Sequence, residues 1–318
     1  MIGAFYLAIL TERVFIIDHT SPLPLNYTLV PNHINWDIAH LVASTSTSVT
    51  FRLIDKPYEE VCTQVFAAHD DNVDVIRLTL NTYALGREVW LENGGRSRCQ
   101  GGMLRLQQTE SEKRQYKSAA ETFHLGFHAL FKFSRPVKER AKEMQKAMGL
   151  FNSNGLLTPY VGVHARLGGT TQNSNLIAGW TDPERHKITD IHRFLSCASQ
   201  HACAVGSPKC MSIVVLSDNQ GFRSEISNLS SLIRYFAETT IVHVDRSIAA
   251  EHVMRRGNLD TFAELKILSQ SVCIVGSESA FSAVGASISL VHHRSPCFVN
   301  FKQCDNSPYR FWESHGLR

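Results

Sequence analysis

YVGVHAR, residues 160–166, is a short apolar run that ends in a histidine and an arginine. Such a run, with no alternation of polar residues, is typical of a strand buried on both faces of a parallel sheet. Three more apolar runs follow, and stretches with helical periodicity separate them. The second half of the chain is therefore expected to be a Rossmann-like α/β domain. The later runs lie at 212–216, 240–244 and 272–275, and the helical stretches at 188–200, 221–236, 261–271 and 279–286.

The first half of the chain also alternates helical and strand patterns. Residues 2–11 are expected to form a helix, and strands are expected at 14–18 and 73–78. A polar segment at 151–155 then reads as a linker. We therefore expect two α/β domains, an N-terminal one at residues 1–155 and a C-terminal one at residues 156–318.

The pattern from residue 112 to residue 148 predicts two consecutive helices. The first carries an apolar stripe at helical spacing. Ser134 is placed to cap the second helix, Pro136 suits its first turn, and Gly149 suits its end. The stripe consists of Phe123, Phe127, Leu130 and Phe131, and the apolar face of the second helix of Ala141, Met144 and Met148.

Composition excludes several classes of protein. The chain has 318 residues, of which 43% are apolar, so it can bury a sizeable core. Its net charge of +3 gives no reason to expect a nucleic acid as partner. The longest apolar stretch, residues 2–10, is far shorter than the ~20 residues that cross a bilayer. We therefore expect no membrane segment in this chain.

The eight cysteines contain no C-x-x-C pair, so neither a zinc ribbon nor a thioredoxin motif is expected. Local disulfides are expected in two loop regions, and the alternative is a set of free buried thiols. Cys273, in an apolar run, is expected to be free. Two N-x-S/T sequons, at Asn26 and Asn228, agree with the secretory pathway. The two loop regions hold Cys197, Cys203 and Cys210, and Cys297 and Cys304.

Polar residues follow three of the predicted strands, at the edge where α/β sheets bind ligands. Arg166 follows the first strand and Asp218 the second. A guanidinium at a buried strand end needs a carboxylate or a ligand anion, and its planar fork suits a phosphate. Arg166 therefore indicates an anion site, with an ion pair to Glu264 as the alternative.

The third strand is followed by Gly276, Ser277 and Ser279 at the start of a helix. The free N–H groups at a helix N-terminus favour an anion, and the two hydroxyls lie beside them. The alternative is an ordinary serine N-cap. The chain has no P-loop, no G-x-G-x-x-G fingerprint, no H-E-x-x-H and no D-x-D motif. We therefore expect no metal at this site.

Four segments together resemble the fucosyltransferases of the GT-B fold, a superfamily that includes α1,6-, protein O- and xyloglucan-type α1,2-enzymes. Their order and spacing carry the resemblance. It implies an α/β GT-B architecture of two Rossmann-like, doubly wound domains that face a cleft. The segments are AFYLAILTERVFIID (4–18), the region from FHLGF to FSRPV (123–137), VGVHAR (161–166), and the region from AELKILSQS to GSESAF (263–281).

The resemblance implies inverting transfer of fucose from GDP-fucose to a glycan or glycoprotein acceptor, with no metal and no further cofactor. Negative charge that develops on the leaving diphosphate must then be stabilised by an arginine and by helix N-terminal amides. The resemblance assigns catalytic roles to Arg166 and Glu264. It assigns donor binding to His164, Arg166, Asp218, Ser277, Ser279, Ala280 and Phe281.

Some assignments stay open at this stage. Thr261 and Glu264 have the spacing of a helix capping box, which is an alternative role for Glu264. No general base can be assigned. Asp182, Glu184 and His186 follow Arg166 in a loop and are candidates, with plain solvation as the alternative.

The chain also departs from the family pattern. Leu167 follows the H-x-R motif, so the second arginine and the aspartate that several relatives carry there are absent. The first strand and glycine-rich loop of the family would precede residue 1. These departures leave two alternatives: a catalytically inactive protein that binds a glycan or nucleotide, and a GT-B enzyme that uses another nucleotide sugar. The expected location is the Golgi or secretory lumen, with an anchor outside this chain.

Overall fold

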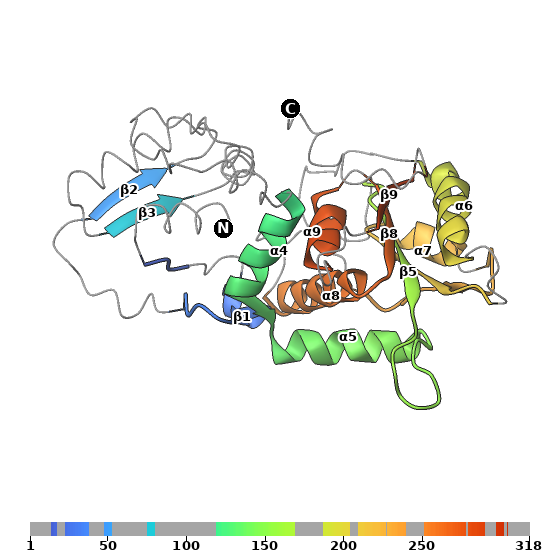
Figure 1. Cartoon of the computed structure of the whole chain (residues 1–318), viewed down its shortest axis with the longest axis horizontal. Coiled ribbons are helices and arrows are strands. Elements are labelled where there is room, and N and C mark those ends of the chain that lie inside the picture. The colour runs from blue at the N-terminus through green and yellow to red at the C-terminus, as the bar shows by residue number, and fades with distance from the viewer. Residues whose placement is uncertain are drawn as a thin grey trace, which may run out of the picture. The chain divides into compact units, whose positions relative to one another are not determined.

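The protein is represented by a computed structural model, shown in Figure 1. The chain divides into two compact units, one of residues 1–18 and 31–131 and one of residues 19–30 and 132–316. These units are defined by packing, and the division into domains at 1–155 and 156–318 stays a prediction. The structure describes residues 14–17, 23–37, 48–52, 75–79, 119–168, 187–203, 209–226, 228–239, 251–277, 279–289, 297–301 and 304.

The first unit contains a pair of parallel strands, β2 (Ser48–Arg52) and β3 (Val75–Thr79). Strand β3 confirms the strand predicted at 73–78. Residues 14–17 belong to no helix or strand, so the strand predicted at 14–18 is wrong over these residues. The helix predicted at 2–11 lies outside the described residues.

The same unit contains helix α4 (Ala119–Leu130), whose end is held by Trp36. The Trp36 indole N–H donates to the Leu130 carbonyl at 2.6 Å, and the Trp36 carbonyl accepts from the Ile17 N–H at 3.1 Å. Trp36 is buried and contacts Phe131 edge-on, with the ring centroids 5.5 Å apart. One aromatic residue therefore joins residues 14–17 to the end of α4.

A short strand separates α4 from the next helix, where the sequence predicted two consecutive helices. Strand β4 (Phe131–Phe133) pairs with β1 (Leu29–Pro31), which follows the 3-10 helix η1 (Leu25–Tyr27). Within β4 the two phenylalanines are buried and Lys132 is exposed. Burial of every second residue is typical of a strand, so Phe131 belongs to β4 and not to the apolar stripe of the helix.

Helix α5 (Arg135–Ala147) confirms the second predicted helix. Ser134 is its N-cap and accepts a hydrogen bond from the Val137 N–H at 3.5 Å. Gly149, at φ +68°, follows its end, a backbone conformation that glycine adopts without strain. Its buried face includes the predicted residues Ala141 and Met144.

The second unit is built on a five-stranded sheet in the order β7-β6-β5-β8-β9, with every pair parallel. This order, with the first strand in the middle, is that of a doubly wound Rossmann-like sheet. The strands are β5 (Tyr160–Ala165), β6 (Ser212–Ser217), β7 (Ile233–Arg234), β8 (Cys273–Gly276) and β9 (Phe298–Asn300). The helices are η6 (Ile188–Asp190), α6 (Ile191–Ala202), α7 (Gln220–Ile226), α8 (Glu251–Ser269) and α9 (Ala280–Ile288).

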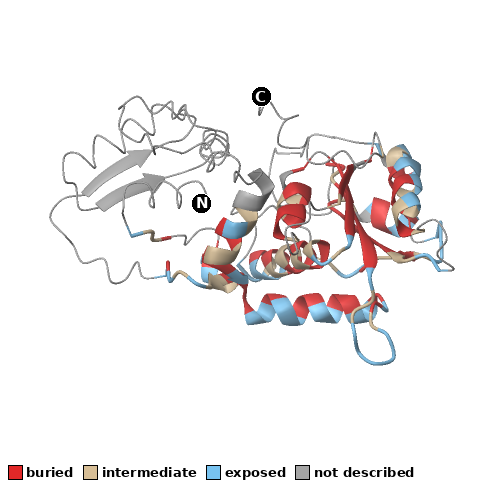
Figure 2. Cartoon of the chain, in the orientation of Figure 1, coloured by how far each residue is buried: buried red, intermediate tan, exposed pale blue. Residues whose placement is uncertain are grey.

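Helices cover both faces of this sheet, as Figure 1 shows. Helices α6 and α7 pack against one face, where Val161, Val163 and Val215 lie. Helices α5, α8 and α9 pack against the other face, where Val214 and Ile274 lie. In Figure 2 strands β5 and β8 are buried along their length, and α5 is buried on one side only. The apolar runs at 160–165, 212–216 and 272–275 are therefore strands covered on both sides, as predicted.

Several elements of the second unit differ from the prediction. Helix α7 ends at Ile226, and the predicted helix 221–236 gives way to a turn and to β7. Helix α8 begins ten residues before the predicted start at 261, and β9 was not predicted. The strand predicted at 240–244 lies outside the described residues.

Three disulfides lie in the second unit. Cys203–Cys210 closes a local loop, as predicted, but Cys197–Cys304 and Cys273–Cys297 join the two loop regions to distant partners. The prediction that Cys273 is free is therefore wrong. Because β8 and β9 are neighbours, with Ile274 opposite Phe298, Cys273 and Cys297 are brought side by side. Among the residues described, no helix combines the length and apolar character that a bilayer-spanning segment requires.

Candidate functional site

The carboxyl ends of β5, β6 and β8 lie side by side, because these strands are parallel neighbours in the sheet. Four predicted site residues converge there: His164 in β5, Arg166 after β5, Asp218 after β6, and Ser277 after β8. The Ser277 N–H donates to the His164 carbonyl at 3.0 Å. The Ser277 Oγ accepts from the Arg166 N–H at 2.9 Å. Residues from three separate predicted junctions thus form one hydrogen-bonded group.

Arg166 is partly accessible to solvent, with its side chain one-fifth exposed (20%), whereas Asp218 is buried. Its Nη1 atom lies 3.0 Å from Oδ2 of Asp218. The ion pair that the sequence left open for Arg166 is therefore to Asp218, whereas Glu264 pairs elsewhere. A partly exposed guanidinium that a carboxylate holds at a strand end can also present its fork to an anion.

Asp218 is buried and shapes the turn that follows β5. Its Oδ1 accepts from the Leu167 N–H at 2.8 Å, and its Oδ2 accepts from the Gly168 N–H at 3.0 Å. Gly168 has φ +70°, which suits glycine. One carboxylate therefore holds both the backbone of the turn and the side chain of Arg166.

The His164 side chain points to the face of the sheet that α5, α8 and α9 cover, and it contacts α9. Its Nδ1 atom lies 2.6 Å from the Ser282 Oγ, and its ring lies against Phe281, with the centroids 4.7 Å apart. Burial lowers the pKa of His164 from its ordinary 6.5 to about 3, although Asp218 opposes the shift. His164 is therefore a neutral imidazole at physiological pH, and it fixes the start of α9 against β5.

The low pKa of His164 predicts that the free energy of unfolding depends on pH. Since the folded chain binds the proton less well than the unfolded chain, stability present above pH 6.5 is lost as the pH falls toward 3. The loss is up to about 1.4 kcal/mol per pH unit for this group. We expect His164→Asn, which keeps a partner for Ser282, to flatten the fall between pH 6.5 and 5 in urea unfolding. Exposed His192→Asn should not; identical profiles for the two variants would contradict the prediction.

Ser277 and Ser279 have different local roles. Ser277 is fully buried, and its hydroxyl also donates to the His164 carbonyl at 3.3 Å. Ser279 is the N-cap of α9 and accepts from the Phe281 N–H at 3.3 Å, which is the ordinary capping role left open by the sequence. Ala280 is the first residue of α9. The site therefore includes the N-terminus of a helix, where backbone N–H groups favour an anion.

Gly276 lets side chains of β9 and α9 pack closely against the end of β8. A Cβ at residue 276 would lie 2.9 Å from Cε2 of Phe298 and 3.0 Å from Cβ of Ser282. Such distances are too short for van der Waals contact. Glycine is therefore required for the close packing of β8, β9 and α9 beside the site.

Thr261 lies in the interior of α8 and is not an N-cap, so the capping-box alternative for Glu264 is wrong. Glu264 also lies within α8, and the Thr261 hydroxyl donates to the Gly257 carbonyl at 2.8 Å. Glu264 Oε1 is 2.7 Å from Nη1 of Arg223, close enough for an ion pair but without the geometry of an aligned hydrogen bond. Burial raises the pKa of Glu264, while Arg223 opposes the shift.

Arg223 is the functional candidate that the sequence reasoning missed. It is fully buried in α7, and its Nε donates to the Ser217 carbonyl at 2.7 Å. Ser217 precedes Asp218, so Arg223 fixes the end of β6 at the site. The sequence signal for Arg223 is weak, because this residue lies at the border of the apolar face of the predicted helix, about 100° around the axis from Phe222. The general-base candidates Asp182, Glu184 and His186 lie outside the described residues.

The fold and the site define a class. A doubly wound parallel sheet with an arginine, a carboxylate and a helix N-terminus at its carboxyl edge is the architecture of Rossmann-like proteins that bind anionic ligands. Comparison with known proteins narrows the class. No protein-family model matches the chain, and no curated protein matches it by sequence. Solved structures do match it by fold.

Three of these solved structures are fucosyltransferases. A mutant of Arabidopsis thaliana FUT1 in complex with GDP matches with a TM-score of 0.55 and 14% identity, over 91% of this chain and 64% of that chain. The fucosyltransferase NodZ from Bradyrhizobium matches with a TM-score of 0.52 and 13% identity, over 95% and 89%. NodZ α-1,6-fucosyltransferase co-crystallised with GDP matches with a TM-score of 0.50 and 14% identity, over 89% and 85%. The chain thus has a GT-B, fucosyltransferase-like fold, as predicted.

Proposed function

We propose that the chain is a glycosyltransferase that transfers fucose, with inversion, from GDP-fucose to a glycan or glycoprotein acceptor. The observation that carries the proposal is the convergence of Arg166, Asp218 and Ser277 at the carboxyl edge of the sheet. The likeness to fucosyltransferases crystallised with GDP supports a guanosine diphosphate donor.

In the proposed reaction the acceptor hydroxyl oxygen attacks C1 of the fucose. The bond from C1 to the β-phosphate oxygen breaks, and GDP leaves with the bonding electrons. The guanidinium of Arg166 and the N-terminal amides of α9 stabilise the charge that develops on the diphosphate. The reaction needs no metal under this proposal, because these groups supply the positive charge. The proton of the acceptor hydroxyl passes to a base, for which Asp182, Glu184 and His186 are the candidates.

The remaining site residues hold these groups in place. Asp218 orients Arg166 and the turn after β5 through three contacts. His164 and Phe281 fix the start of α9, and Ser279 caps it. Glu264 acts as a positioning residue under this proposal, through Arg223 and the end of β6.

A thermal-shift experiment tests the donor. Anything that binds the folded chain alone stabilises it by mass action, by about 2.7 kcal/mol at a hundred times its dissociation constant. We expect GDP and GDP-fucose to raise the melting temperature by a few degrees, and UDP and CDP to raise it less. No shift with GDP would remove the proposal. A larger shift with UDP or CDP would favour a GT-B enzyme that uses another nucleotide sugar.

A transfer assay separates an enzyme from a binding protein. GDP binding without transfer of fucose to any of a broad panel of glycans and glycoproteins would favour the inactive alternative. We further propose that the chain acts in the Golgi or another secretory lumen. The three disulfides of the second unit support this location, because disulfides persist in oxidising compartments.

A further inference from the structure

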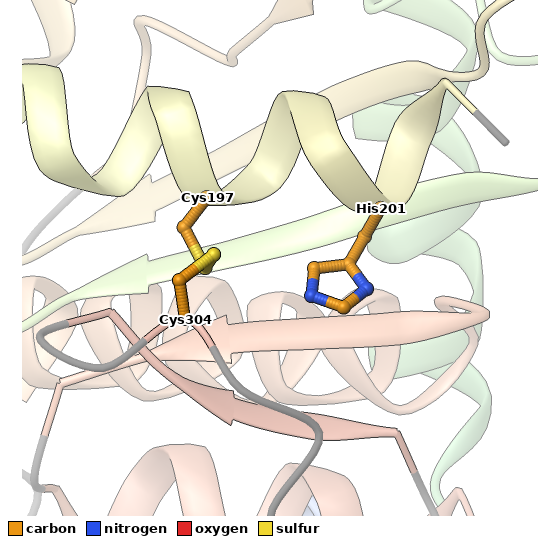
Figure 3. A group of neighbouring side chains, drawn as sticks. All are labelled: Cys197, His201 and Cys304. Atoms are coloured by element: carbon orange, nitrogen blue, oxygen red, sulfur yellow. A yellow bond between two sulfur atoms is a disulfide. The ribbon is translucent and has the colours of Figure 1, made fainter. Parts of the chain in front are cut away.

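Two cysteine side chains and a histidine side chain lie together beside helix α6, at Cys197, His201 and Cys304 (Figure 3). Cys197 and His201 lie one helical turn apart on α6, so they share a face. Cys304, from the segment after β9, meets them there. One sulfur from each cysteine and one ring nitrogen of His201 all lie within 4.8 Å of one another.

A second pair of cysteines reaches the same histidine. The sulfur atoms of Cys273 and Cys297 and a ring nitrogen of His201 also lie within 4.8 Å of one another. In the structure the four cysteines form two disulfides, Cys197–Cys304 and Cys273–Cys297. His201 is therefore common to two disulfides that come from α6, β8 and the chain on either side of β9.

His201 has the properties of a metal ligand. Its Nε2 atom is buried and makes no hydrogen bond within the described part of the chain. Burial lowers the pKa of His201, so the ring is neutral near pH 7 and has a lone pair to offer. Thiolate sulfur and imidazole nitrogen are the ligands that zinc prefers, at about 2.3 and 2.0 Å. A modest spread of the sulfur atoms would place them around one ion.

We propose that this group is a redox-dependent zinc site. In the oxidised chain it consists of two disulfides; in the reduced chain His201 binds Zn²⁺ together with one pair of cysteines, Cys197 and Cys304 or Cys273 and Cys297, and water completes the coordination. Reduction by a dithiol gives each disulfide two electrons and two protons, and the dithiol becomes a disulfide. Zinc then displaces the protons of the coordinating thiols and is not itself reduced.

Zinc bound by Cys197, Cys304 and His201 would tie α6 to the segment after β9, and zinc bound by Cys273, Cys297 and His201 would tie α6 to β8. Cys273 is the first residue of β8, whereas the candidate donor site lies beyond its last residue, Gly276. The two sites are therefore at opposite ends of this strand, and the zinc proposal does not rest on the proposed function.

Zinc stoichiometry tests the proposal in the full chain. After anaerobic reduction, addition of Zn²⁺ and removal of the excess, we expect at least one zinc per chain by elemental analysis. The oxidised chain should retain none at this site. Competition with a chromophoric chelator should show that His201→Ala weakens the tightest zinc binding on the order of tenfold or more. Cobalt absorption in place of zinc should report thiolate ligands and change in the same variant.

Two variants serve as matched controls. His192 is an exposed histidine on the same helix, and His192→Ala should leave zinc affinity unchanged. Cys203 and Cys210 form the disulfide outside the group, and replacing both by serine should also have no effect. The proposal is overturned if the reduced chain holds no zinc, if the oxidised chain binds it equally, or if His201→Ala behaves as His192→Ala does.

Discussion

Arg166→Ala is expected to abolish sugar transfer and to leave the fold intact. Asp218, the ion-pair partner of Arg166, would still accept hydrogen bonds from the Leu167 and Gly168 N–H groups, so its buried carboxylate would not be stranded. The backbone N–H of residue 166 would still donate to Ser277. What the variant loses is the guanidinium that, under the proposed function, stabilises the leaving diphosphate. Removing one such group costs roughly 10²- to 10³-fold in kcat.

The measurement is turnover of GDP-fucose, together with the melting temperature of each variant. Arg166→Lys keeps the charge but not the planar fork, and should recover only part of the rate. Arg193→Ala removes an exposed arginine from α6 and should leave the rate unchanged. Full activity in Arg166→Ala would remove the donor-site assignment. A variant that is inactive and also unfolds would show that the two backbone hydrogen bonds do not suffice to hold the Asp218 carboxylate without Arg166.

The buried strands and the capped helices could be predicted from the sequence, because their causes are local. The apolar run at 160–165 became β5 with the predicted bounds. Ser134, Pro136 and Gly149 marked the ends of α5 correctly, since each acts through its own backbone conformation.

Elements that depend on distant partners could not be predicted in this way. Strand β7 has two residues and exists because it pairs with β6, while β4 exists because it pairs with β1. Their sequences also fit helices, and the partner decides between the two. The pairing of the cysteines could not be predicted for a related reason, because disulfide connectivity does not follow from spacing. Cys273 meets Cys297 only because β9 lies beside β8.

The site shows the same division between local and distant causes. Arg166, Asp218 and Ser277 could be chosen because each follows a predicted strand, and parallel strands bring their ends together. The ionic partners could not be chosen, because several charges of opposite sign compete for each of them. Glu264 was one predicted partner of Arg166, but in the structure it lies on α8 beside Arg223 and forms its ion pair there.

Arg223 is a buried residue that contacts several groups around the end of β6. It is only 1% exposed, and its guanidinium bonds to the carbonyls of Ser217 and Phe236 and, at 2.7 Å, to the Thr239 hydroxyl. It also neutralises Glu264 at 2.7 Å. A neutral side chain at position 223 would leave buried acceptors without donors and a buried carboxylate without its counter-ion.

Arg223→Met is therefore expected to lower the free energy of unfolding by about 3–5 kcal/mol, the cost of breaking a buried pair from one side. Adding Glu264→Gln should restore part of the loss, because no charge then remains unpaired. In the single variant the pKa of Glu264 should rise further, and since protonation relieves the unpaired charge, the deficit should be smaller at pH 5 than at pH 8. Urea unfolding of both single variants and the double variant measures these effects as a double-mutant cycle. A loss below about 1 kcal/mol, or strictly additive losses, would show that the Arg223–Glu264 pair does not stabilise this edge of the sheet.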